Sequence, residues 1–194
     1  NILISNANIY DGEGNEFLET DLLIQDRKVI AIGKDLPINN NFNIIDATDK
    51  WVTPGIIDIH SHMGVYPAPG VSTSSDGNEA TSPVTADVWA EHSIWVQDPQ
   101  YALALKGGIT AFHILPGSAN LIGGRGVTVK NIQRNTIDSM KFPDAPHSLK
   151  MACGENPKRV YGNRGQAPST RMGNAAGYRT VSYTHLTLPT KVSV

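Results

Sequence analysis

The residues best suited to chemistry in this sequence are two histidines, His60 and His62, spaced i and i+2. They end an apolar stretch, residues 56–59, that follows a Pro-Gly pair. Residues two apart on a β-strand point to the same face, so both imidazoles can aim at one point at the strand end. Two neutral imidazoles that converge make half of a transition-metal site. We therefore predict a divalent metal, with Zn²⁺ preferred, although many His-x-His pairs share a face by chance and bind nothing.

A carboxylate precedes the histidines on the same expected face. Asp58 lies two residues before His60 and one layer deeper in the strand. Carboxylates at such positions commonly orient the ring of a metal-binding histidine. We expect Asp58 to orient His60.

A second carboxylate, Glu155, follows another apolar stretch at residues 149–153. Pro157 then prevents the backbone from continuing as a central strand. A simple ion pair with Lys158 or Arg159 would explain Glu155 without any chemistry. Those two cations could instead orient a substrate carboxylate.

Other polar side chains are weaker candidates for substrate contact. The glycine-rich segment 116–126 lacks the Gly-Lys-Ser/Thr ending of a phosphate loop, and it is either a tight turn or a substrate contact. Arg125 or Lys130 could face an anionic group of a substrate. His92 lies beside a long loop and is a candidate pocket residue, with a structural histidine as the alternative. His113, in the middle of an apolar stretch, is expected to pack inside the fold.

The elements that must hold these residues change character along the chain. Residues 1–50 alternate in the period of strands, with a tight hairpin turn expected at residues 26–28. From residue 51 the pattern becomes strand, loop, helix and strand, with strands at 56–60, 109–115, 127–130 and 149–153. The apolar first strand should be buried on both faces. A long loop at 65–87 and a helix at 98–106, capped by Asp98, complete an α/β pattern that favours a parallel sheet.

Several of these stretches, in order, resemble the start of the amidohydrolase superfamily. They are ISNANIYDG (residues 4–12), DLLIQDRKVIAIG (21–33), DATDKWVTPG (46–55) and TPGIIDIHSH (53–62). The resemblance implies an α/β fold: the N-terminal part of a (β/α)₈ TIM-like barrel, preceded by part of a small β-sandwich. On this basis residues 1–50 belong to the sandwich, and residues 51–180 form the first βα units of the barrel, which is truncated after about three strands.

The same resemblance implies a metal-dependent hydrolase of carbon–nitrogen bonds other than linear peptide bonds. Its substrates would be small amides, cyclic amides or dipeptide-like compounds, and His60 and His62 would hold one or two divalent ions. The segment GENPK (154–158) resembles the branch related to imidazolonepropionase, which makes Glu155 a candidate third ligand or bridging carboxylate. A heterocycle deaminase of the same fold is the alternative activity.

The end of the sequence departs from this pattern. VSYTHLTLPTK (181–191) resembles a peptide translated from sequencing-adapter DNA, so we expect residues 181–194 to be a non-native tail, with a genuine short strand as the alternative. The metal ligands and catalytic aspartate of the superfamily's later strands have no counterpart here, which leaves the catalytic residues unknown. We expect the chain by itself to be an inactive fragment, or a metal-binding module without catalysis.

Composition narrows the classes of partner that the protein could bind. The net charge of −2 and 40% hydrophobic residues are ordinary for a globular protein and predict neither a nucleic-acid nor a membrane partner. The single cysteine excludes an internal disulfide framework. We expect a cytoplasmic enzyme with a small-molecule substrate; export stays open because the sequence begins at Asn1, and a homo-oligomer of the intact enzyme also stays open.

Overall fold

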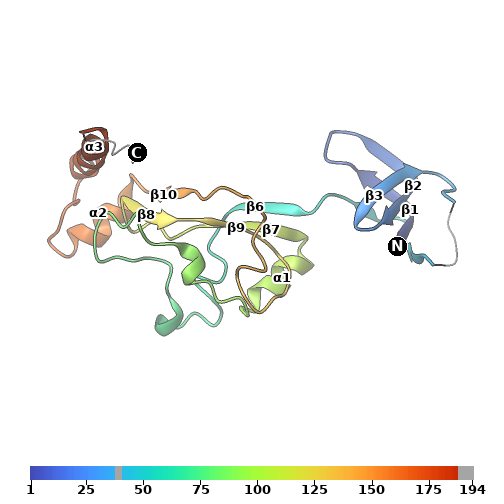
Figure 1. Cartoon of the computed structure of the whole chain (residues 1–194), viewed down its shortest axis with the longest axis horizontal. Coiled ribbons are helices and arrows are strands. Elements are labelled where there is room, and N and C mark those ends of the chain that lie inside the picture. Colours follow the sequence, from blue (N-terminus) through green and yellow to red (C-terminus); the bar gives the residue numbers. More distant parts are fainter. Residues whose placement is uncertain (38–40, 188–194) are drawn as a thin grey trace, which may run out of the picture. The chain divides into compact units, whose positions relative to one another are not determined.

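The computed structural model describes residues 1–37 and 41–187, with side chains through residue 184 (Figure 1). It divides into two compact units, one ending at Gly55 and one beginning at Ile56. We call these the N-terminal unit and the second unit, and describe each by itself. None of the described helices is long and apolar enough to cross a membrane.

The N-terminal unit is one mixed sheet. Its strands are β1 (Ile2–Tyr10), β2 (Glu16–Gln25), β3 (Lys28–Gly33), β4 (Asn43–Asp46) and β5 (Trp51–Val52). The order is β3-β2-β1-β4, with β5 beside β1. β2 and β3 are antiparallel to their neighbours, whereas β4 and β5 run parallel to β1.

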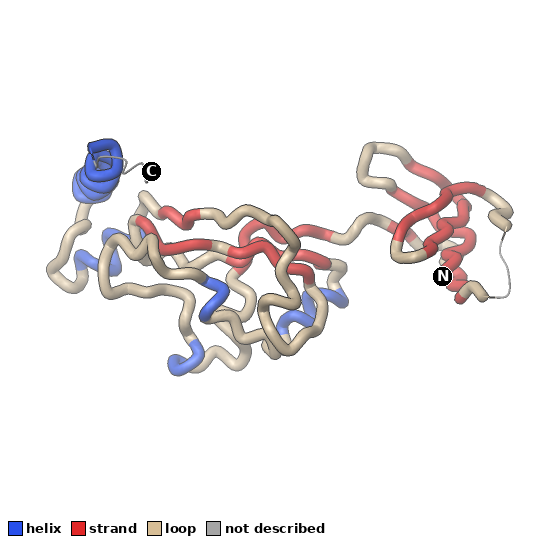
Figure 2. Tube along the Cα trace, viewed as in Figure 1, coloured by secondary structure: helices blue, strands red, loops and turns tan. Residues whose placement is uncertain are grey.

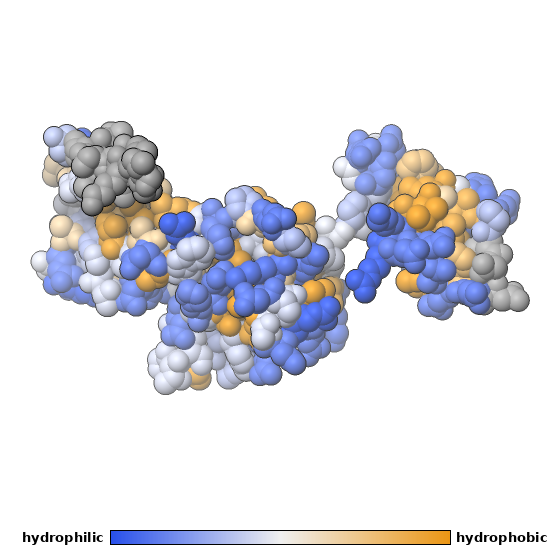
Figure 3. All heavy atoms as spheres, in the orientation of Figure 1, coloured by the Kyte–Doolittle hydropathy of each residue, from blue (hydrophilic) through white to orange (hydrophobic). Residues whose placement is uncertain are grey.

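The hairpin between β2 and β3 forms where the sequence predicts it. Gln25 pairs with Lys28 across a two-residue loop, and both loop residues, Asp26 and Arg27, have positive φ values of 50° and 64°. That backbone is the form whose twist matches the flanking strands. Alternate apolar residues of β1 and β2 then form a small core with Ala47, and hydrophobic surface remains visible on this unit in Figure 3.

The second unit carries the histidines on a three-stranded sheet of order β6-β7-β9. β6 (Ile56–Ser61) is parallel to β7 (Ile109–Ile114), as expected, and β9 (Val127–Lys130) is antiparallel to β7. The strand expected at 149–153 is shorter, β10 (Leu149–Met151), and pairs antiparallel with β8 (Ile122–Arg125) in a separate sheet. A parallel connection needs a crossover of a dozen or more residues, usually helical, and no helix lies between β9 and β10.

The core of the second unit lies on one face of β7. Phe112 and Ile114 are fully buried there, and Tyr101 of α1 (Gln100–Lys106) packs edge-on against Phe112, with ring centroids 5.7 Å apart. The expectation that β6 is buried on both faces is wrong: Ile57 is 62% and Ile59 76% exposed. The described helix beside this sheet, α1, packs on β7 and leaves these β6 side chains uncovered.

Loops make up much of the second unit, as Figure 2 shows. The long loop after β6 contains only short 3₁₀ turns, η1 (Ser72–Ser74) and η2 (Ala90–His92). The helix expected from residue 98 begins at Gln100, whose backbone N–H donates to the Asp98 carboxylate at 3.0 Å. Two further helices follow, α2 (Glu155–Gly162) and α3 (Arg171–Thr187).

The expected non-native tail begins inside α3. Residues 181–187 continue that helix without a break, so the alternative of a short strand at this position is wrong. Residues 188–194 of the expected tail lie outside the described residues.

Candidate metal centre

His60 and His62 converge as the strand spacing predicts. Their rings are 5.5 Å apart between centroids and meet edge to face at 83°. The Nδ1 atom of His62 lies 2.9 Å from the backbone oxygen of Leu115. A carbonyl can only accept, so Nδ1 carries the proton and Nε2 keeps a free lone pair. His62 is therefore held in the tautomer that binds a metal through Nε2.

Asp58 acts on the backbone of the strand. Its Oδ1 atom accepts a hydrogen bond from the backbone N–H of His60 at 3.1 Å. This contact fixes the path of the strand just before the histidines. Orientation of the His60 ring by Asp58 stays a prediction.

Lys150, in the middle of β10, is a site residue that the sequence reasoning missed. Its Nζ atom lies 2.9 Å from Nε2 of His60, although the two residues are 90 positions apart in sequence. Lys150 is only 9% exposed, and burial lowers the pKa of its amine. The positive charge of Lys150, followed by burial, lowers the pKa of the His60 imidazole. The available signal was a lysine between the two apolar residues of a short strand, Leu149 and Met151.

His113 of β7 links three segments of the second unit. Its Nδ1 atom is 2.9 Å from Thr128 Oγ1 of β9, and its Nε2 atom is 2.7 Å from Ser148 Oγ, just before β10. Burial, and then the charge of His60, lowers the pKa of His113. With both nitrogens bonded, His113 supports the approach to β10 and offers no lone pair to a metal.

Glu155 is the first residue of α2 and is exposed. Across the described part of the chain, no three His, Cys, Asp or Glu side chains come together as a metal site. The structure thus brings His60 and His62 together and does not group Glu155 with them. A ligand role for Glu155 stays a prediction.

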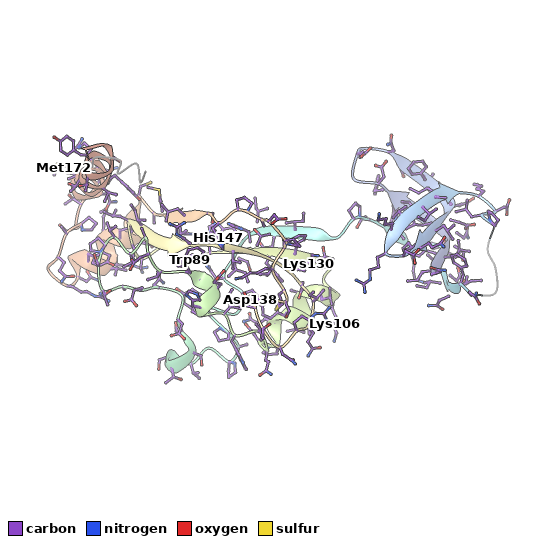
Figure 4. All side chains as sticks on the ribbon, in the orientation of Figure 1. Trp89, Lys106, Lys130, Asp138, His147 and Met172 are labelled. Carbon is purple, nitrogen blue, oxygen red and sulfur yellow. The ribbon has the colours of Figure 1, made fainter. Side chains whose placement is uncertain are left out.

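Two of the candidates for substrate contact, Arg125 and His92, lie near Trp89 in the second unit. The Arg125 guanidinium stacks 4.9 Å above the Trp89 ring. The ring of His147 meets the same Trp89 ring at a centroid distance of 4.5 Å, and Figure 4 labels Trp89 and His147. His92 has a side chain that is 75% exposed, and it lines a cavity of about 380 Å³ that also contains Asp76 and Glu79. Contact between a substrate and either residue stays a prediction.

A second cavity, of about 290 Å³, opens beside His62. Polar side chains from three segments line it: Tyr66 and Asn78 from the long loop, Ser118 from the glycine-rich loop, and Asn156 and Arg159 from α2. The glycine-rich loop therefore reaches a pocket next to the histidines. The expected contact between this loop and a substrate stays a prediction.

The donor set fits part of a zinc site. Two imidazoles at one strand end, one of them with a fixed tautomer, supply two of the three or four protein ligands that zinc takes. Nε2 of His60 is bonded to Lys150 in this state, so metal binding requires the amine to release that lone pair. The pair can thus begin a metal centre and needs further ligands to complete it.

The chain as a whole is similar to known amidohydrolases. No family model matches the chain. An amidohydrolase from Thermotoga maritima MSB8 superposes with a TM-score of 0.85 and 42% identity, over 95% of this chain and 47% of that one. This match confirms the fold class expected from the sequence.

Curated relatives match over shorter fractions of their own length. The amidohydrolase tasK of Hapsidospora irregularis is 35% identical over 171 residues, which are 82% of this chain and 17% of the relative. A dihydroorotase of Ligilactobacillus salivarius is 43% identical over 70 residues, 35% of this chain and 15% of the relative. The chain therefore spans less than a fifth of each of these two relatives and about half of the solved structure.

Proposed function

The chain belongs to the amidohydrolase superfamily. From this premise we propose that its activity is the metal-dependent hydrolysis of carbon–nitrogen bonds in small amides. Cyclic amides are the favoured substrate class, because one of the similar proteins is a dihydroorotase. The observation that carries the proposal is the convergence of His60 and His62, with Nδ1 of His62 bonded to Leu115.

A bound divalent metal, with zinc preferred, would lower the pKa of a water molecule to about 7 and polarise the scissile carbonyl. The residues of this chain prepare that site. Leu115 fixes the His62 tautomer, and Asp58 fixes the backbone at His60. Glu155 is proposed as a further ligand from the α2 side.

Lys150 sets a condition on this site. A protonated amine 2.9 Å from Nε2 of His60 would repel a metal cation and occupy the lone pair that the metal needs. Burial lowers the pKa of the amine, which makes its proton easier to lose when a cation approaches. We propose that metal enters as Lys150 releases His60.

Zinc titration of the 194-residue chain by calorimetry tests the proposal. We expect His60→Ala and His62→Ala each to weaken zinc binding at least tenfold, and the double variant to abolish it. His92→Ala is the matched control, because it removes an exposed imidazole at the other cavity. Zinc binding that is equal in the wild type and the double variant would refute the site.

Two further measurements extend the test. Glu155→Gln should weaken zinc binding if this carboxylate is a ligand and leave it unchanged otherwise. Zinc-dependent ring opening of hydantoin, lost in His62→Ala, would establish the reaction, with a linear dipeptide as the comparison substrate.

A further inference from the structure

Among the described residues that line the 290 Å³ cavity beside His62, one carries a permanent charge, the guanidinium of Arg159, and none is Asp or Glu. The 380 Å³ cavity of the second unit differs, since Asp76 and Glu79 line it. The surroundings of His62 thus favour a negatively charged group.

Most of the donors of Arg159 remain available. A guanidinium carries five N–H donors in a planar fork, and one hydrogen bond is seen here, from Nη2 to Asn156 Oδ1 at 3.4 Å. Asn156 in turn donates to Ser118 Oγ at 2.6 Å. This chain of contacts places the fork at one wall of the pocket, on the helix that begins with Glu155.

Other residues that line the cavity supply neutral donors. The Asn78 side-chain amide donates to the hydroxyl oxygen of Tyr66, which leaves the Tyr66 O–H free to donate. Burial raises the pKa of Tyr66, so the hydroxyl stays protonated at neutral pH. Asn78 is itself fixed, because its Oδ1 accepts from the backbone N–H of Ala119 at 3.0 Å. A Cβ at Gly117 would collide with the side-chain ends of both Asn78 and Tyr66, so glycine there lets these two side chains keep their positions.

From this arrangement we propose that the pocket binds the carboxylate of an amide substrate, with Arg159 as the anion-binding residue and Tyr66 as a neutral donor. A planar carboxylate matches the guanidinium fork, which can bind it through two parallel hydrogen bonds. The amide of the same molecule would then face His62. The substrate class is therefore an N-acyl or cyclic amide that carries a carboxylate, and its assignment as substrate rests on the proposed function.

The test is a titration of the chain with N-acetylglycine, followed through the ring resonances of His62 by NMR. N-acetylglycinamide, which lacks the charge, is the comparison ligand. We expect saturable binding of the carboxylate, at least tenfold tighter than that of the amide. Arg159→Gln should weaken it at least tenfold, and Arg159→Lys should restore only part of the loss because an ammonium lacks the fork.

Lys158→Gln is the matched control, since it removes the same charge from the neighbouring residue, which is not among those that line the cavity. It should change the affinity less than twofold. Equal binding of the two ligands, absence of saturable binding, or equal losses in the Arg159 and Lys158 variants would each overturn the inference. Circular dichroism of each variant is the check that it is folded.

Zinc calorimetry on the same samples separates this inference from the proposed function. Zinc binding through the histidines, with no effect of Arg159→Gln on N-acetylglycine, would refute the anion site alone. Arg159-dependent binding of N-acetylglycine without zinc binding would refute the metal site and leave the anion site standing.

Discussion

The two units of the chain hold their backbones in different ways. In the N-terminal unit, ladders between strands and apolar side chains account for most of the order, and among its described residues Thr20 is the buried polar side chain. Among the residues of the second unit whose burial is described, seven polar ones are buried: Ser61, Thr85, Asp98, Asn120, Asn131, Lys150 and Asn174. Most of these hydrogen-bond to segments distant in sequence.

This difference follows from what each unit must hold. A sheet satisfies its own backbone, whereas long loops must find partners elsewhere for their buried N–H and C=O groups. Asn120, for example, donates to Glu79 and Thr85 and accepts from Tyr161. Buried polar side chains therefore hold the segments that line the His62 pocket. Removing such a side chain should lower the stability of the second unit more than that of the N-terminal unit.

The largest effect is expected from Phe112→Ala, which removes a fully buried ring from the centre of the second unit. Such a truncation costs about 3–5 kcal/mol in the free energy of unfolding. Urea unfolding followed by tryptophan fluorescence in a Trp51→Phe background measures it, because Trp89 and Trp95 then report on the second unit alone. Leu103→Ala, at a side chain that is 65% exposed, should change stability by less than about 0.5 kcal/mol. Similar losses in the two variants would contradict the assigned core.

Asp98→Ala tests the buried polar contacts next. The Asp98 carboxylate accepts from the backbone N–H groups of Gly64, Ala68 and Gln100, at 3.0–3.3 Å. Leaving a buried donor unpaired costs about 1–3 kcal/mol. Because water reaches part of this site in the variant, we expect the free energy of unfolding to fall by about 3 kcal/mol in total.

Because Gly64 lies two residues after His62, Asp98→Ala should also weaken zinc binding. Asp98→Asn keeps one acceptor oxygen and should lose less stability. Unchanged zinc binding in a destabilised Asp98→Ala variant would show that zinc binding does not depend on the contacts that Asp98 makes with this loop.

A pair of glycines compares the two units directly. Gly124 and Gly14 have nearly the same φ, 102° and 101°, but a Cβ at Gly124 would lie 2.6 Å from the Val88 oxygen, whereas nothing lies within 4 Å of a Cβ at Gly14. Alanine at either site incurs the backbone strain of positive φ, about 1–3 kcal/mol. We expect Gly124→Ala to destabilise its unit more than Gly14→Ala destabilises its own, measured by urea unfolding. Equal losses would mean that the close approach of Val88 is relieved without cost.

The smallest effect concerns Asp11 in the N-terminal unit. A hydrogen bond from the Asn15 side chain, and then one from the Glu13 backbone, lowers the pKa of this carboxyl group. The resulting stability is present above the unfolded pKa of about 3.9 and is lost as pH falls through the lower folded pKa. Asn15→Ala should move the folded pKa back toward its ordinary value, as measured by NMR titration of the Asp11 carboxyl carbon. A pKa that Asn15→Ala leaves unchanged would contradict this assignment.

Local features were the most predictable from the sequence. The Asp26-Arg27 turn, the strand that ends at the histidines and the helix after Asp98 all depend on neighbouring residues, and all three form. The partner of β10 was not predictable, because the segment between β9 and β10 carries no periodic signal to set the direction of return. The continuation of α3 through residues 181–187 was missed because a threonine-rich sequence has weak helix propensity.

The sequence by itself determined that His60 and His62 share one face of a strand, since the two-residue period of a strand is a local property. Only the tertiary structure decided what surrounds them. Lys150 reaches His60, and Arg159 shares a cavity with His62, because separate segments pack together there. Such contacts join residues about 90 positions apart, and their geometry depends on strand pairing and loop packing that no local pattern encodes.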